Sequence, residues 1–396
     1  MPVTEVSAGF RYPGLADYVS AMERWVHPEV QRALDTPAAR GRERLLFGCL
    51  VWGDKYVDRF LEFCVPSLLA SGNVDVFRDS LFLIHTDVKN RKRVERVLEC
   101  LEPFGEVEVR AIPQDVIRKA KEYPMNKYWV LGAANYIHMN TAKWRGYGHH
   151  LLMPDHIYSM GFFGNLKRLR DEGHQAIIRG GLSAKVEEVG PILKTQNCAF
   201  KAEDLNALAM SHLHPQFEAL VLNGRNDYPI STLVVLVVDG AAVIVSPHSA
   251  TVYMSNAVLR RAQLRLFNTI DGQLPYIIPE DIAPYFPQPK DGMSYIEISD
   301  AEKGANPKGS GWTLVDFCVE YWMLTYADPK FLRFFHSPTI MQFPKGYKPP
   351  VKPMGEAEFG KRLDELWTSV DKMKEPMRQV YADRKRIEAE KCAEVT

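Results

Sequence analysis

The amino-acid sequence predicts an α/β fold, a doubly wound mixed sheet flanked by helices, with a C-terminal helical extension. Three apolar runs predict it. The first, LLFGCLVW at 45–52, is continuous, which is typical of a strand buried on both faces of a parallel sheet. The runs at 80–86 and 107–113 follow, and segments whose apolar residues have helical spacing separate the three. This alternation of strands and helices indicates right-handed crossover connections between parallel strands.

The rest of the chain continues the alternation. Periodicity and turn residues predict helices over 125–144, 163–172, 202–213 and 311–326, and strands over 151–153, 174–181 and 295–298. Over 232–258 a β-hairpin is predicted, because two apolar runs meet at Asp239-Gly240, a common hairpin turn. A proline-rich connector at 338–353 then leads to a long charged helix at 356–394.

Composition bounds the function. The 396 residues include 49 basic and 49 acidic side chains, so the formal net charge is zero. Binding to nucleic acid in general requires a surplus of Lys and Arg, so this class is disfavoured. The N-terminus has no basic start followed by an apolar segment, and no apolar stretch approaches the roughly 20 residues that span a membrane. We therefore expect a cytoplasmic protein without a transmembrane segment.

Several motifs that the α/β pattern would allow are missing from the sequence. No G-x-G-x-x-G follows the first apolar run, and the chain has no G-x-x-x-x-G-K-[ST]. It also has no H-E-x-x-H and no G-x-S-x-G. These absences disfavour a standard dinucleotide-binding domain, a P-loop NTPase, a zinc protease of the H-E-x-x-H type and an α/β-hydrolase.

Polar side chains follow the first two predicted strands, where ligands bind in open α/β sheets. Asp54 and Tyr56 follow the first strand, and Thr86 and Asp87 follow the second. We expect these four residues to contact a nucleotide. The alternative is structural: Asp54 caps the next helix, Tyr56 is part of the core, and Thr86 and Asp87 cap a turn.

Candidates for the remaining roles lie further along the chain. Asn126 and Lys127 begin a predicted helix, where the helix N-terminus favours an anion and Lys127 can reach a phosphate oxygen. Asp155 and His156 follow a short strand and are candidate ligands of a metal or a diphosphate. For Lys127 the alternative is an exposed lysine, and for Asp155 and His156 it is a turn cap and a structural hydrogen bond.

Two later residues are candidate acid–base groups. His248 lies in SPHS after a predicted strand, and Asp271 lies in NTIDG. Either could take the proton of an acceptor hydroxyl during group transfer. The structural alternatives are a histidine hydrogen-bonded in the core and an aspartate that only forms a D-G turn.

With these segments in order, residues 45–275 resemble glycosyltransferases of the GT-A type. The resemblance rests on LLFGCLVW opening into GDKYVDRF, on the helix and strand of NKYWVLGAANYIHMNTAKWRGYGHHLLMPDHIYS, and on the later SPHS and NTIDG sites. It implies a lead-in at 1–44, a GT-A-like nucleotide-sugar-binding catalytic domain at 45–300, and the C-terminal helical extension with its connector at 301–396. Where the family has D-x-D, this chain has Pro154-Asp155-His156-Ile157, with one acid instead of two.

The resemblance implies transfer of a sugar from a nucleotide-sugar donor to a hydroxyl of a glycan, lipid-linked or protein acceptor, as in polysaccharide biosynthesis. Asp54, Tyr56, Thr86, Asp87, Asn126 and Lys127 would bind the nucleotide, and Asp271 or His248 would be catalytic. Asp155 and His156 would hold Mg²⁺ or Mn²⁺ on the diphosphate. Because the D-x-D is incomplete, metal-independent transfer using cationic side chains is the alternative.

Two other functions remain open at this point. A nucleotidyltransferase uses a similar sheet but needs a basic, glycine-rich loop after the first strand, and GDKYVDRF fits that poorly. A non-catalytic glycosyltransferase-like binding module would explain the incomplete D-x-D. The charged C-terminal helix is a candidate for homodimer contacts.

Overall fold

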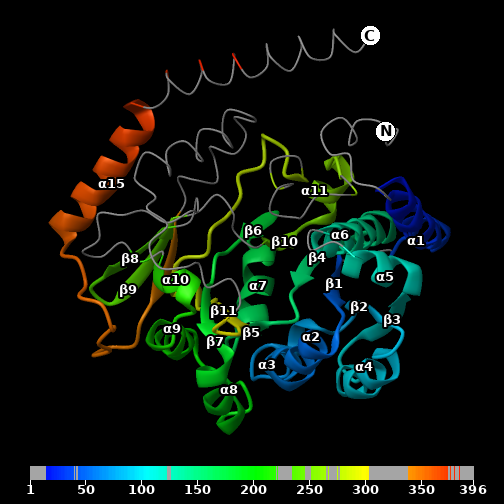
Figure 1. Ribbon diagram of the computed structural model, residues 1–396, viewed down its shortest axis with the longest axis horizontal. Helices are drawn as coiled ribbons and strands as arrows, with labels where there is room; N and C mark the ends of the chain where they lie inside the picture. The colour runs from blue at the N-terminus through cyan, green and yellow to red at the C-terminus, as the bar shows by residue number, and fades with distance from the viewer. Residues whose placement is uncertain are drawn as a thin grey trace. The chain divides into compact units, whose positions relative to one another are not determined.

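A computed structural model gives the arrangement of the elements (Figure 1). It describes residues 15–39, 41, 43–122, 126–219, 221, 234–245, 251–264, 266, 274, 277–302 and 338–372, with isolated positions at 375, 379 and 383. The chain divides into two units built from alternating stretches. Unit 1 is Met1–Leu61, Phe77–Pro154 and Tyr253–Ile277, and unit 2 is Glu62–Val76, Asp155–Val252 and Ile278–Thr396. Among the described helices, none has both the length and the apolar character needed to cross a membrane.

Unit 1 is built on a mixed, mostly parallel sheet. Its strands are β1 (Arg44–Val51), β2 (Leu81–Asp87), β3 (Glu106–Ile112), β4 (Tyr147–Leu152) and the end of β10 (Thr251–Met254). Their order is β3-β2-β1-β4-β10; the first four are parallel and β10 is antiparallel to β4. The predicted fold class is confirmed, and the three predicted strands are confirmed to within one residue at each end.

Helices cover both faces of this sheet (Figure 1). They are α1 (Leu15–Asp35), α2 (Asp54–Arg59), α4 (Arg91–Leu98), α5 (Gln114–Glu122), α6 (Asn126–Arg145) and α11 (Asn256–Arg261). Helix α6 packs on β1 and β4, with α1 and α5 against it, whereas α4 packs on β2 and β3. Trp25 of α1 is only 3% exposed and belongs to the core between α1, α5, α6 and the sheet. The segment predicted as a lead-in therefore contributes a helix to the core of unit 1.

Unit 2 contains two three-stranded sheets, β5-β11-β7 and β12-β9-β8. Its strands are β5 (His156–Tyr158), β6 (Ala176–Ile178), β7 (Leu182–Lys185), β8 (Val234–Val238), β9 (Ala241–Val245), β11 (Tyr295–Ser299) and β12 (Thr339–Gln342). Its helices are α3 (Val65–Leu68), α7 (Phe162–Asp171), α8 (Val186–Thr195), α9 (Ala202–Ser211), α10 (Pro215–Ala219) and α15 (Glu356–Lys372). Short helices η2 (Phe60–Cys64), η3 (Val74–Val76), η4 (Glu99–Leu101) and η5 (Pro289–Asp291) complete the described elements of the two units.

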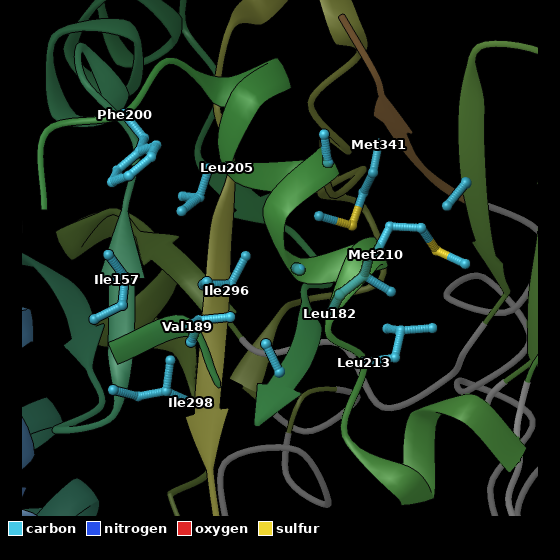
Figure 2. Close-up of a cluster of buried hydrophobic side chains, with 14 of the residues drawn as sticks. Ile157, Leu182, Val189, Phe200, Leu205, Met210, Leu213, Ile296, Ile298 and Met341 are labelled. Atoms are coloured by element: carbon cyan, nitrogen blue, oxygen red, sulfur yellow. The ribbon is translucent and has the colours of Figure 1, made fainter. Parts of the chain in front are cut away.

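An apolar cluster holds unit 2 together, and Figure 2 shows part of it. Ile157 of β5, Leu182 of β7 and Ile296 of β11 are fully buried there, and Met210 of α9 packs with them. Met341 of β12 is also fully buried in this cluster. The cluster therefore joins strands of both sheets to α9 in one core.

The hairpin predicted over 232–258 is confirmed in part: β8 and β9 pair in antiparallel register around Asp239-Gly240, whereas 251–258 form β10 and the start of α11. Gly240 has φ 71°, the left-handed conformation that such turns require. The interpretation of 338–353 as a connector was wrong in part, because β12 pairs with β9 from Thr339 to Gln342. Because prolines lie close to both ends of TIMQ, the sequence pattern indicated a connector and not a strand. The predicted helix at 311–326 lies outside the described residues.

Candidate functional site

The register of the sheet in unit 1 places Trp52, Asp87 and Ile112 in one row across the ends of β1, β2 and β3. Leu50 of β1 is the partner of His85, and Asp87 at the end of β2 is the partner of Ile112. Side chains two residues apart on a strand point to the same face. Trp52, two residues beyond Leu50, therefore extends the row of Asp87 and Ile112 on the face covered by α5 and α6.

A cavity of about 320 Å³ lies at this edge of the sheet. Its walls come from three segments: residues 52–54 after β1, residues 87–90 after β2, and Ile112 with Gln114, Ile117 and Lys121 of α5. Trp52, Ile112 and Ile117 also pack against or within the apolar core of the unit. The walls of the cavity thus combine apolar side chains with carboxylate, amide and ammonium groups, which is the composition of a small-molecule site.

Asp87 holds the two loops of the cavity together. Its Oδ2 accepts a hydrogen bond from the backbone N–H of Gly53 at 2.8 Å. Its Oδ1 accepts from the backbone N–H of Asn90 at 3.0 Å, and the Asn90 side-chain amide donates to both oxygens at 3.1 Å. Asp87 therefore fixes the loop after β1 against the loop after β2.

Asp54 stands beside this pair and is exposed. Its Oδ1 accepts from the Asn90 amide at 3.1 Å, and its Oδ2 is 2.6 Å from Lys89 Nζ. The hydrogen bond from Lys89, with that from Asn90, lowers the pKa of the Asp54 carboxyl. Asp54 is accordingly an anion at neutral pH, and one amide, that of Asn90, links it to Asp87.

The structural alternative for Asp54, a cap of the next helix, does not hold in the structure. Gly53 is the N-cap residue of α2, with φ 79° and ψ 137°, and Asp54 is the first residue of the helix. The N-cap residue has no side chain here, so no side-chain hydrogen bond caps the helix. The backbone angles of Gly53 are a conformation that residues with a Cβ rarely adopt, which explains why glycine occupies the position.

Tyr56 and Thr86, the other two residues predicted to contact a nucleotide in this region, do not line the cavity. Tyr56 lies in α2, and the guanidinium of Arg59 is 5.8 Å from the centre of its ring. Thr86 is fully buried and is paired in register with Val51, so it points to the face opposite Asp87. The structure brings Asp54 and Asp87 together and leaves Tyr56 and Thr86 outside the site.

Four other predicted site residues lie partly or wholly outside the described residues. Asn126 and Lys127 form the start of α6, as predicted, and their side chains lie outside the described residues. His248 and Asp271 also lie outside the described residues. Their roles stay predictions.

Asp155 and His156 belong to unit 2, at the start of β5. The backbone carbonyl of Asp155 accepts a hydrogen bond from Ile298 N–H at 2.9 Å, which anchors it to β11. His156 is 7% exposed and stacks on Tyr295 with ring centres 4.4 Å apart. Burial lowers its pKa to about 3, so the imidazole is neutral and keeps a nitrogen lone pair at physiological pH.

The described part of the chain contains no group of three or more His, Cys, Asp or Glu side chains arranged to hold a metal ion. Asp155 and His156 are adjacent and have suitable donor atoms, but no third described ligand joins them. The described residues therefore contain no site with three protein ligands for Mg²⁺ or Mn²⁺.

Of the residues that line the cavity, sequence reasoning proposed only Asp54 and Asp87 as site residues, and those it missed include Trp52, Asn90, Gln114, Ile117 and Lys121. The strand-end argument that found Asp54 and Asp87 also covers Trp52, which closes the first apolar run. Gln114, Ile117 and Lys121 have the i, i+3, i+7 spacing of one helix face, which is visible in the sequence. Nothing in the sequence shows that this face turns toward the strand ends.

Comparisons with known proteins add little to this geometry. No protein-family model and no curated protein matches the chain. Among solved structures, the inositol-1-phosphate CTP transferase from T. maritima aligns with a TM-score of 0.33 and 11% identity, covering 73% of this chain and 97% of that one. A mannosyltransferase from Pyrobaculum calidifontis, in complex with GDP-Man and Mn²⁺, aligns with a TM-score of 0.35 and 11% identity, covering 81% and 77%. Neither similarity assigns an activity to this chain.

Proposed function

We propose that this chain is a nucleotide-dependent transferase that moves a sugar from a nucleotide-sugar donor to a hydroxyl acceptor. The observation that carries the proposal is the cavity at the carboxyl ends of β1, β2 and β3, whose walls include Trp52, Asp54 and Asp87. Open α/β sheets bind their ligands at this edge. The nucleoside part of the donor would occupy the cavity.

The chemistry of the walls suits a nucleoside. A flat base can stack on the Trp52 indole, an interaction worth about 1–3 kcal/mol per base. Both oxygens of Asp87 already accept hydrogen bonds from Gly53 and Asn90, whereas Asp54 is exposed. A carboxylate offers about four acceptor positions, so Asp54 has the greater capacity left for the hydroxyl groups of a ribose.

The remaining steps of sugar transfer are assigned on sequence grounds. Asp155 and His156 would bind the diphosphate of the donor, directly or through Mg²⁺ or Mn²⁺. Asp271 or His248 would accept the proton of the acceptor hydroxyl, and Asn126 with Lys127 would contact the nucleotide. A glycan, lipid-linked or protein acceptor fits this scheme equally, and homodimer contacts through the C-terminal helix remain part of it.

The test is a thermal-shift and calorimetric screen of the full chain. The ligands are UDP, GDP, CDP and CMP and their sugars, each with and without Mn²⁺. Stacking predicts that Trp52→Ala weakens binding of the preferred nucleotide about tenfold, or roughly 1.4 kcal/mol. Trp144→Ala is the matched control, because Trp144 is 43% exposed and does not line the cavity.

The possible results separate the candidate functions. Binding of a nucleotide sugar, followed by transfer of its sugar to an acceptor, supports the proposal. If a sugar phosphate and a nucleoside triphosphate are instead converted to a nucleotide sugar and pyrophosphate, the chain is a nucleotidyltransferase. Failure of the wild-type chain to bind any nucleotide would overturn the proposal in favour of a binding module for another ligand.

A further inference from the structure

Helix α5 presents one narrow face to the cavity. Gln114, Ile117 and Lys121 lie at positions i, i+3 and i+7, and all three line it. The adjacent face carries Val116 and Ala120, which are buried in the core with α1 and α6. Because this buried face fixes the rotation of the helix, the amide, aliphatic and ammonium groups keep a fixed order along the cavity wall.

Lys121 is the cation of this wall that remains available to a ligand. The second lysine of the cavity, Lys89, already pairs with Asp54 at 2.6 Å. Within the described part of the chain, no carboxylate pairs with Lys121, which is exposed. Asp115, in the first turn of the same helix, pairs with Arg24 at 3.1 Å and not with Lys121. A negative charge entering the cavity can therefore engage Lys121 without breaking an ion pair.

We propose that α5 determines which ligands the cavity accepts, with Gln114 reading the edge of the base and Lys121 binding the phosphate nearest the nucleoside. This inference rests on the proposed function and deepens it, because it names the residues that would recognise the base and the 5′-phosphate of the donor. Seven residues at about 1.5 Å of rise each separate Gln114 from Lys121 by about 10 Å along the helix. The primary amide of Gln114 both donates and accepts hydrogen bonds, and lysine is a point charge that suits phosphate.

The test compares ligands that differ by the phosphate alone. Uridine, UMP and UDP, and guanosine, GMP and GDP, are titrated into the full chain by calorimetry. Lys121→Met is expected to weaken binding of the mono- and diphosphates about tenfold and to leave the nucleosides unchanged. Arg118→Met is the matched control, since Arg118 is an exposed cation of the same helix that does not line the cavity. Gln114→Leu is expected to reduce the preference between uracil and guanine.

The outcomes distinguish this inference from the proposed function. If the wild-type chain binds phosphorylated nucleotides and Lys121→Met binds them equally well, the role of Lys121 is overturned and the proposed function stands. Equal losses for nucleosides and nucleotides would also overturn it, because they would indicate a change in the wall itself. A wild-type chain that binds no nucleotide would overturn both. An unchanged base preference in Gln114→Leu would overturn the role of Gln114.

Discussion

Asp87 Oδ2 accepts a hydrogen bond from the backbone N–H of Gly53 at 2.8 Å, which joins the ends of two neighbouring parallel strands. The loop after β1 departs from the sheet at Gly53, and this bond fixes where it departs. Asn90 completes the joint through its own backbone N–H and its side-chain amide. The shape of the cavity thus depends on one carboxylate at the end of β2.

Replacing Asp87 by Asn is therefore expected to destabilise unit 1 and weaken ligand binding together. One oxygen becomes an NH₂ group, which cannot accept from Gly53 or Asn90, and a hydrogen bond to a charged group contributes about 1.5–3 kcal/mol. Urea denaturation and calorimetry measure the two effects. Asp54→Asn is the matched control: Asp54 is an exposed acid in the same site, so its loss should leave stability nearly unchanged. Equal stability of the two variants would contradict the joint described for Asp87.

Two glycines of β1 and its loop should resist substitution for different reasons. Gly53→Ala meets no atom within 4 Å, but φ 79° makes it a strained position, at a cost of about 1–3 kcal/mol. In Gly48→Ala the new Cβ would lie 2.6 Å from Cγ and Nδ1 of His138, so the packing of α6 must shift, again at about 1–3 kcal/mol. Gly355→Ala meets no atom and has no positive φ, so thermal unfolding should show it near wild type. A neutral Gly53→Ala would exclude the backbone strain.

The part of the site that could be predicted from the sequence follows from strand logic. Continuous apolar runs mark β1 and β2, and the residues after them, Asp54 and Asp87, meet in one cavity. Thr86 shows what strand patterns alone cannot predict, because neighbouring residues on a strand point to opposite faces of the sheet. The sequence located the second strand correctly, but only the register showed that Asp87 and not Thr86 shares a face with α5.

The contribution of α5 could not be predicted, because it depends on tertiary packing. The helix is amphipathic, and the sequence shows which residues share a face, but not that Gln114, Ile117 and Lys121 face the strand ends. The division into two units is similarly hidden, since each unit is assembled from three separate stretches of chain. The four-residue strand β12 has too short an apolar pattern, between prolines, to be distinguished from a connector.

Buried histidines should make unit 1 sensitive to acid. His85, His138 and His149 are fully buried on the α6 side of the sheet, and His85 Nδ1 is 2.8 Å from His138 Nε2. Burial, with the nearby positive charge of Arg110 and Arg32, lowers the pKa of His85 to about 3. Burial likewise lowers the pKa of His149 to about 3, and that of His138 well below its ordinary value of 6.5.

The sign of the pH effect follows from these shifts. Below about pH 6.5 the unfolded chain binds protons that the folded chain does not, so the stability present above pH 6.5 falls as the pH falls toward 3. His149→Leu should reduce this slope and be neutral or stabilising at pH 7.5, because neither ring nitrogen of His149 has a hydrogen-bond partner to lose. Thermal unfolding between pH 7.5 and 4.5 measures both effects, with the exposed His27→Leu as control. A strong loss of stability at pH 7.5 would show that the ring has a partner, such as a buried water.

In unit 2, replacing Arg179 by the uncharged methionine should destabilise the fold less than replacing it by lysine. Arg179 is 2% exposed and donates to the carbonyl oxygens of Pro287 at 2.9 Å and Ile340 at 3.3 Å. Burial lowers its pKa to about 10, so it remains a buried cation. The negative charge of Asp291 acts on it through space, but among the described residues no hydrogen bond or ion pair joins Arg179 to a carboxylate, and Asp291 pairs with Arg168 instead.

Lysine would keep that buried charge but lose the planar fork that spans two carbonyls, and its ammonium is more strongly hydrated. Methionine would leave two carbonyls without a donor, at about 1–3 kcal/mol each, yet would remove the cost of burying an ion that has no directly paired carboxylate, which is several kcal/mol. We therefore expect Arg179→Lys to be less stable than Arg179→Met in urea denaturation. Hydrogen exchange at 339–342 should increase in both variants, because the bond to Ile340 anchors β12. The opposite order of stability would mean that the charge itself is neutralised in the folded chain.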